Sequence, residues 1–435
     1  MALGGGSFTT QNKVLPGAYI NFVSAASASS ELSDRGVATM PLELDWGIDG
    51  EIFTVTQEDF QKHSLRIFGY DYTSEKLKGL RDLFLNIKVL HAYKVNAGGV
   101  KAANDFATAS CTGIRGNDLK IVIQVNADDD SKLDVVTLLD TSIVDSQTVT
   151  EASELAANDF VVFKSDAKLA ATAGTPLAGG TNGTTQGEGY MTYLNKMESY
   201  TYNAMGVVTT DEAVKSLFTA YNMRLRDEMG IKFQTIIYQK PADYMGVVNV
   251  KNKISDDGWN EASMVYWVTG AIAGCAVNKS NQNKKYNGEF TVDTTYTKAE
   301  LIAAIQAGEF TLHKVNSDIR VLEDINSMVT VSDAQGEVFK ENQTIRVIDQ
   351  LANDDALLFH TKYLGVVPNN AAGRVSLWSD LVKIRMQLQD LGAIENFSDS
   401  DVVVEQGETK KSVVVSGAVT VANAMSKLYM TTTVA

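Results

Sequence analysis

The sequence contains few of the residues from which disulfide, metal and cofactor sites are built. Cys111 and Cys275 are its only cysteines, they lie far apart, and no CxxC motif is present. That spacing argues against both a disulfide framework and a zinc site. The four histidines are scattered along the chain, without a carboxylate or cysteine at ligand spacing. We therefore predict that the protein holds no metal and no cofactor.

Catalytic motifs are also missing. The chain has no GxSxG, HExxH, Walker or GxGxxG motif, and the glycine cluster at 179–183 lacks the Lys-Ser/Thr pair of a phosphate-binding loop. Asp128, Asp129 and Asp130 could hold calcium, but successive carboxylates on a hairpin point in different directions, so a solvated turn is the simpler interpretation. We predict that the protein is not an enzyme and has no catalytic residues.

A basic block and a long apolar run are absent as well. The formal net charge is −15, which argues against nucleic acid or an anionic membrane as a partner. The longest apolar run, Met264–Val277, is too short to span a bilayer and predicts a buried helix. No secretory signal is visible at the N-terminus. We expect a soluble protein made in the cytoplasm, without membrane insertion.

What is present is an alternation of strands and helices that is interrupted once and that gives way to a different unit near residue 335. The length of 435 residues predicts roughly two to four domains. Alternation starts at Gly36 and resumes after about residue 190. The apolar periodicity there predicts strands at 37–44, 88–95, 232–238 and 245–250, and helices at 57–68, 74–86 and 257–277. A further helix begins at a capping box formed by Thr209 and Glu212 and ends at Gly230. This pattern predicts an α/β layer domain.

The segment between these two halves has a different residue pattern. Residues 105–164 contain short β-branched runs separated by turn-rich segments, with no convincing helix. We predict strands at 119–125, 133–139, 142–149 and 160–163. The segment therefore reads as an antiparallel β-sandwich inserted into the α/β domain. A Gly/Thr/Ala-rich connector at 170–190 leads out of it.

A third unit, of the α+β class, starts near residue 335. It contains a predicted helix at 342–353, a segment at 357–366 that fits either a strand or a helix, a strongly periodic helix at 375–391, and then strand-rich sequence. The predicted domains are an N-terminal arm (1–23), a split core (24–96 and 184–335), the β insertion with its linker (97–183), a C-terminal domain (336–426) and a C-terminal arm (427–435).

The helix at 375–391 has two different faces. Its apolar residues recur at helical spacing and should face a core: Leu377, Leu381, Ile384, Leu388 and Leu391. The opposite face is polar and of mixed charge: Ser376, Asp380, Lys383, Gln387 and Asp390. This polar face is either an ordinary solvated surface or a docking surface for a partner.

Both ends of the chain read as apolar extended strands. The N-terminal arm carries Leu15, Tyr19, Ile20 and Phe22, and the C-terminal arm carries Leu428, Tyr429, Met430 and Val434. Fully burying one such side chain is worth roughly 1.5–3 kcal/mol. Each arm is therefore either an edge strand of the chain's own sheet or a strand donated to a neighbouring copy.

Several short motifs, in order along nearly the whole chain, resemble the tail sheath proteins of contractile phage tails and R-type bacteriocins, in their PBSX-like or diffocin-like branch. The motifs that carry this resemblance are Pro16-Gly17-Ala18-Tyr19, Arg35-Gly36-Val37-Ala38, Asp45-Trp46-Gly47, Phe68-Gly69-Tyr70, Gly113-Ile114-Arg115-Gly116-Asn117-Asp118, Leu177 to Gly183, Ala273-Gly274, Lys284-Lys285-Tyr286 and Tyr363-Leu364-Gly365.

The resemblance implies a subtilisin-like α/β central domain without the protease triad. It also implies hexameric rings stacked around an inner tail tube and linked by strands that the terminal arms exchange between subunits. Such a sheath is assembled in the bacterial cytoplasm and contracts to drive the tube through a target envelope, with baseplate and tail terminator proteins as further partners. The particle would be a virion or a bacteriocin released on lysis.

By the same resemblance, Asp380, Lys383, Gln387 and Asp390 are the candidate contacts to the tube. The β insertion should lie on the outer surface, where few contacts depend on it. The alternative is another self-assembling structural or surface-array protein. An unusual serine hydrolase is the enzyme alternative, and it would need a serine within reach of a histidine that is backed by a carboxylate.

Overall fold

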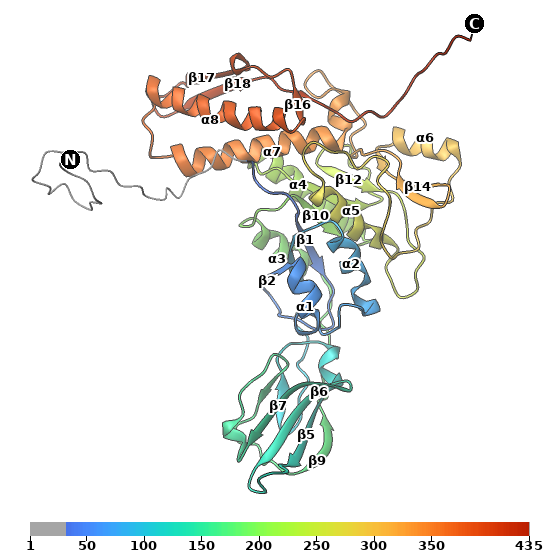
Figure 1. Ribbon diagram of the computed structural model, residues 1–435, viewed down its shortest axis with the longest axis vertical. Coiled ribbons are helices and arrows are strands. Elements are labelled where there is room, and N and C mark those ends of the chain that lie inside the picture. Colours follow the sequence, from blue (N-terminus) through green and yellow to red (C-terminus); the bar gives the residue numbers. More distant parts are fainter. Residues whose placement is uncertain (1–31, 435) are drawn as a thin grey trace, which may run out of the picture.

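The computed structural model describes residues 32–434. Three units follow one another along its longest axis (Figure 1). A C-terminal domain lies at one end, an α/β domain in the middle and a β domain at the other end. The architecture is therefore the predicted combination of an α/β core, a β-sandwich insertion and an α+β C-terminal domain.

A seven-stranded sheet, in the order β13-β12-β11-β10-β1-β3-β2, forms the centre of the middle domain. The strands are β1 (Val37–Leu42), β2 (Ile52–Thr56), β3 (Val89–Lys94), β10 (Ala204–Val207), β11 (Gln234–Tyr238), β12 (Val247–Val250) and β13 (Glu309–Phe310). All pairings are parallel except that of the edge strand β2 with β3. Residues of β10, β11 and β12 are buried throughout, as expected for parallel strands covered on both faces.

Helices cover both faces of this sheet. One face packs against α1 (Gln57–Phe68), α2 (Lys78–Phe84) and α5 (Met264–Gly274). The other packs against α3 (Gly187–Met197) and α4 (Glu212–Met223). The helix predicted over 57–68 is confirmed as α1, with Thr56 as its N-cap and Gly69 closing it in the left-handed region at φ 77°.

Three predicted helix starts are wrong. The helix predicted from residue 375 begins at Ala371. The buried helix predicted from residue 257 begins only at Met264, because Gly258 turns the chain at φ +78° and Asn260 caps a short 3₁₀ turn, Glu261–Ser263. Asp211, rather than Thr209, is the N-cap of α4, since its carboxylate accepts hydrogen bonds from the amides of Ala213 and Val214. At α4 a side chain closer to the helix thus satisfies the free amides, and at α5 the Asn260 side chain caps the 3₁₀ turn that precedes the helix.

Close packing between α5 and α2 depends on Gly274. A Cβ atom at this position would lie 1.7 Å from the carbonyl oxygen of Asn86. We expect Gly274→Ala to lower the free energy of unfolding by about 1–3 kcal/mol, the usual cost of overpacking. Urea denaturation measures this change. Gly187→Ala is the matched control, because a Cβ there meets nothing within 4 Å. Equal stability of the two variants would contradict this explanation.

The inserted domain leaves the sheet after β3 and returns before α3. Its larger sheet has the order β7-β6-β5-β9, and β4 pairs with β8. The bounds are β4 (Ala107–Ala109), β5 (Leu119–Val125), β6 (Leu133–Leu139), β7 (Ser142–Val149), β8 (Val161–Phe163) and β9 (Thr172–Pro176). Trp46 of the α/β domain inserts into its core. Arg115 Nε donates to the Gly69 carbonyl oxygen at 2.7 Å, so the two domains are fastened by packing and by hydrogen bonds.

The remaining elements lie after β12. A helix, α6 (Lys298–Gln306), and a hairpin of β14 (Leu312–Val315) and β15 (Asp318–Val321) complete the middle domain. The C-terminal domain contains α7 (Asn342–Leu358), α8 (Ala371–Asp390), β16 (Ile394–Glu395), β17 (Val402–Gln406), β18 (Val413–Gly417) and β19 (Thr420–Val421). The segment left open at 357–366 is helical, because α7 continues to Leu358 and a π turn follows at Phe359–Tyr363.

Candidate assembly site of the C-terminal domain

The hairpin of β17 and β18 is a sheet with two free edges. These strands pair only with each other among the described residues. One face rests on α8, where Val402 is 3% exposed and Trp378 Nε1 donates to the Val402 carbonyl oxygen at 3.0 Å. Val403 and Val414, on the opposite face, are 45% and 52% exposed. Free edges present unpaired N–H and C=O groups to any further strand.

The C-terminal arm extends away from the body of the molecule (Figure 1). Its root is fixed, since the Ala422 amide donates to the Ala393 carbonyl oxygen and Gln343 bonds to Ala422 and Ala424. Residues 427–434 form no helix or strand. Leu428, Tyr429, Met430 and Val434 are between 77% and 91% exposed. Apolar side chains are therefore held in solvent next to a domain with free strand edges.

Leu15, Tyr19, Ile20 and Phe22 of the predicted N-terminal arm lie outside the described residues. The first described residues attach to α7 and α8. The Leu32 amide donates to Gln387 Oε1 at 3.2 Å, and Ser33 Oγ donates to Asp354 Oδ1 at 2.5 Å. The described chain therefore reaches β1 from the C-terminal domain.

The four candidate tube contacts do not form one exposed face, and the prediction for Asp380 is wrong in this respect. Asp380 is 4% exposed and accepts hydrogen bonds from Lys362 Nζ, at 2.5 Å, and from the Tyr363 hydroxyl. Burial alone would raise the pKa of Asp380, but these two hydrogen bonds outweigh it and lower the pKa. Gln387 is half-buried and accepts the Leu32 amide. Only Lys383 and Asp390 are exposed.

The apolar face of α8 also differs from the prediction at the C-terminal end of the helix. Leu377, Leu381, Ile384 and Leu388 are buried, but Leu391 is 49% exposed, because α8 ends at Asp390. Val375 and Met386 are 62% and 52% exposed. The outward surface of α8 therefore combines Lys383 and Asp390 with two apolar side chains.

The sequence did not reveal the contacts that join the C-terminal domain to the α/β domain. Arg226, in a π turn that follows α4, forms a bidentate pair with Asp349 of α7, with N–O distances of 2.6 and 2.7 Å. The side chains are 1% and 8% exposed. Arg346 of α7 pairs with Asp324 at 3.3 Å, also buried. The partners are far apart in sequence, so no local pattern identifies them.

Residues 32–434 contain neither a candidate metal-binding cluster nor a helix suited to span a membrane. They contain no group of three or more His, Cys, Asp and Glu side chains placed to hold a metal ion. None of their helices combines the length and the apolarity needed to cross a membrane. The features that remain are surfaces: a hairpin with free edges, an extended arm and an outward helix face.

Comparison with known proteins gives these surfaces their context. The phage tail sheath protein β-sandwich domain matches residues 97–182, the phage tail sheath protein central domain matches residues 183–327, and the phage tail sheath C-terminal domain matches residues 334–435. The PBSX phage-like element protein XkdK of Bacillus subtilis is 30% identical over 98% of this chain and 99% of its own length. The chain belongs to the phage tail sheath protein family.

Solved structures agree with this assignment. The sheath tail protein of Desulfitobacterium hafniense is 36% identical, with a TM-score of 0.83, over 95% of this chain and 99% of its own. The helical sheath of the anti-feeding prophage in its contracted state has a TM-score of 0.59 at 12% identity, over 97% of this chain and 99% of its own, which shows a shared fold.

The protein is thus a tail sheath subunit, a structural component of a phage or phage-like contractile tail rather than an enzyme. The predicted resemblance to the PBSX-like branch is confirmed by the likeness to XkdK.

Proposed function

We propose that this subunit polymerises as stacked hexameric rings around an inner tail tube, and that exchanged terminal strands link the rings. Contraction of this sheath would drive the tube through the envelope of a target cell, with baseplate and tail terminator proteins at the ends of the sheath. The observation that carries the proposal is that the C-terminal domain has both an exposed apolar arm and a sheet with unpaired edges. An exposed apolar arm at 427–434 leaves a domain whose hairpin, β17–β18, has two free edges.

Strand addition fits both features. A donated strand satisfies the open N–H and C=O groups of an edge and buries its apolar side chains on the sheet. The hairpin offers two edges and the chain has two arms. Identical subunits that each donate to a neighbour make heterologous contacts, which produce rings or helical arrays rather than closed dimers. The likeness in fold to the contracted anti-feeding prophage sheath supports a helical arrangement.

The family resemblance also implies a more specific fold for the central domain. We infer from the family resemblance that this domain is subtilisin-like and has lost the protease triad. The proposed domain bounds are those predicted from the sequence, with the β insertion on the outer surface of the sheath.

Negative-stain microscopy of the purified full chain tests the assembly. We expect striated tubes or stacked rings at micromolar concentrations of protein. Monomers that persist at every concentration and salt condition, alone and with tube protein, would contradict the proposal.

The outward face of α8 is the proposed contact with the tube, now limited to Lys383, Asp390 and the apolar residues near them. We expect the charge swap Lys383→Glu with Asp390→Lys to weaken assembly on purified tubes about tenfold, because charged contacts that are reversed repel the partner. Co-sedimentation with tubes measures this effect. The matched control swaps Glu58 and Lys62, an exposed pair at 2.6 Å on α1. Unchanged assembly of the α8 variant would rule out this face.

A further inference from the structure

A crevice of about 620 Å³ lies at the carboxyl ends of the central strands, away from the assembly surfaces. Glu43 and Leu44 follow β1, Val95 and Asn96 follow β3, and residues 208–211 follow β10. β1 lies between β3 and β10, so the chain connections diverge to either side at this point. In open α/β sheets such a switch point is where ligands bind. The volume is in the usual range for small-molecule sites.

The lining combines aromatic walls with an acidic mouth. The aromatic residues are Phe68, Tyr70, Tyr190, Trp259 and Tyr266. Four carboxylates at the mouth belong to exposed residues: Glu43, Glu75, Asp211 and Asp257. Lys76 is the one basic residue in the lining, and it pairs with Asp45 at 3.3 Å. Burial, and after it the neighbouring carboxylates of Glu43 and Asp211, raise the pKa of Tyr190 to about 12.

An unpartnered hydroxyl lies in the lining of the crevice. Ser263, just before α5, is fully buried, and its Oγ has no hydrogen-bond partner within residues 32–434. The N-terminus of α5 adds a partial positive charge of about half a unit, which the four carboxylates exceed. A buried hydroxyl without a partner costs free energy, and a ligand N–H group would satisfy it once the Ser263 side chain turns toward the crevice.

We propose that this crevice binds a linear polyamine, an aliphatic chain that carries two or more ammonium groups. Carboxylates on separate loops would hold the ammonium groups, while aromatic faces would cover the methylene chain and attract the cations. A compact metal ion fits less well, because no group of three ligating side chains is placed to hold one among the described residues. The site adds to the proposed sheath function and does not depend on it. Asn96 and Asn182, beside the β insertion, also line it.

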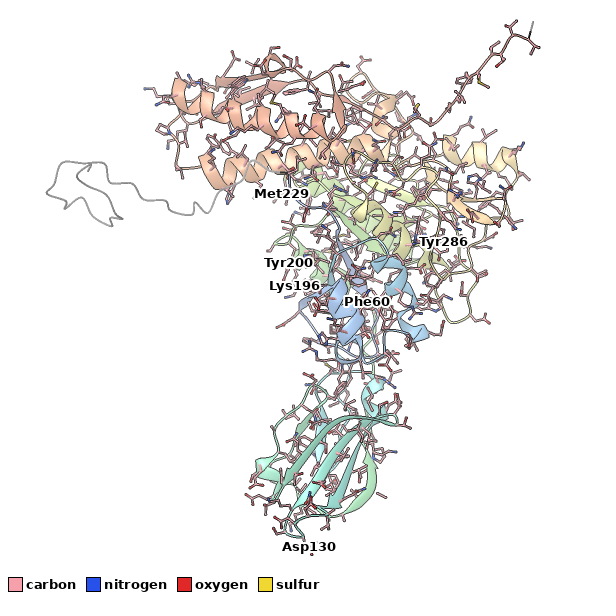
Figure 2. All side chains as sticks on the ribbon, in the orientation of Figure 1. Phe60, Asp130, Lys196, Tyr200, Met229 and Tyr286 are labelled. Carbon is pink, nitrogen blue, oxygen red and sulfur yellow. The ribbon has the colours of Figure 1, made fainter. Side chains whose placement is uncertain are left out.

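Isothermal titration calorimetry with spermidine at fixed ionic strength tests the site. We expect saturable binding of one spermidine per subunit. The double variant Glu43→Gln with Asp257→Asn should bind at least about tenfold more weakly, since two charge contacts are lost. The matched control is Asp130→Asn with Asp166→Asn, which changes the net charge equally on the exposed surface of the β domain; Figure 2 shows Asp130 at the far tip of that domain. This control should bind like the wild type.

Two results of the titration would overturn the inference. The first is an absence of saturable binding by the wild type. The second is an equal loss of affinity in the two double variants, which would mean general attraction of a cation to an acidic protein. A spermidine-dependent shift in tryptophan fluorescence that disappears in Trp259→Phe would place the ligand against the crevice wall. A shift that persists in this variant would place the ligand elsewhere.

Discussion

Removal of residues 427–435 is expected to abolish polymerisation and to leave a folded monomer. The arm carries four exposed apolar side chains, each worth roughly 1.5–3 kcal/mol when buried on a neighbour. Even the lower value, summed to about 6 kcal/mol, corresponds to a loss of about 10⁴-fold in the strength of each contact. Negative-stain microscopy and size-exclusion chromatography of the truncated chain measure the result.

The monomer should survive this deletion because the arm supports nothing in its own subunit. Residues 427–434 form no helix or strand, and the bonds that hold the root of the arm end at Ala424. A chain with Thr432→Ser keeps the length and the apolar residues of the arm, so it serves as the control and should assemble normally. Normal tubes from the truncated chain would mean that the arm is not a donated strand.

Substitution of Asp349 by Asn is expected to lower the free energy of unfolding by about 3–5 kcal/mol, the cost of leaving a buried charge unpaired. Arg226 would lose both of its charged contacts while remaining 1% exposed. Because the pair joins α7 to the α/β domain, the loss should affect both domains. Urea denaturation followed by circular dichroism, together with proteolysis near residues 330–340, measures the change.

An exposed ion pair provides the contrast. Glu58 and Lys62 lie 2.6 Å apart with side chains 72% and 64% exposed, and such solvent-screened pairs contribute little to stability. Glu58→Gln should therefore leave the stability nearly unchanged. If Asp349→Asn is as stable as Glu58→Gln, the buried pair does not hold the two domains together.

The parts of the fold that sequence reasoning predicted are those that local patterns control. The helix at 57–68 has its cap and its closing glycine within its own sequence. The β insertion shows short β-branched runs between turns, and the four strands predicted there correspond to β5, β6, β7 and β8, while the short strands β4 and β9 were not predicted. The predicted start of α5 was wrong because a turn at Gly258 and a capped 3₁₀ turn after Asn260 precede the helix.

The parts that escaped prediction depend on contacts between distant residues. Asp380 read as a surface residue because it falls on the polar side of the predicted helix, whereas Lys362 and Tyr363 approach it from the preceding π turn and bury it. The pair of Arg226 and Asp349 joins positions 123 residues apart. The apolar residues of the two arms are visible in the sequence, but a single chain contains no information about the surface that covers them.

A cryo-electron microscopy reconstruction of tubes assembled from the full chain would show which subunit each arm contacts. We expect β17 and β18 of one subunit to lie in a sheet with residues 427–434 of a second subunit and residues 14–23 of a further one. Arms that pair only with the hairpin of their own subunit, or that leave its two edges open in the assembled tube, would contradict this expectation.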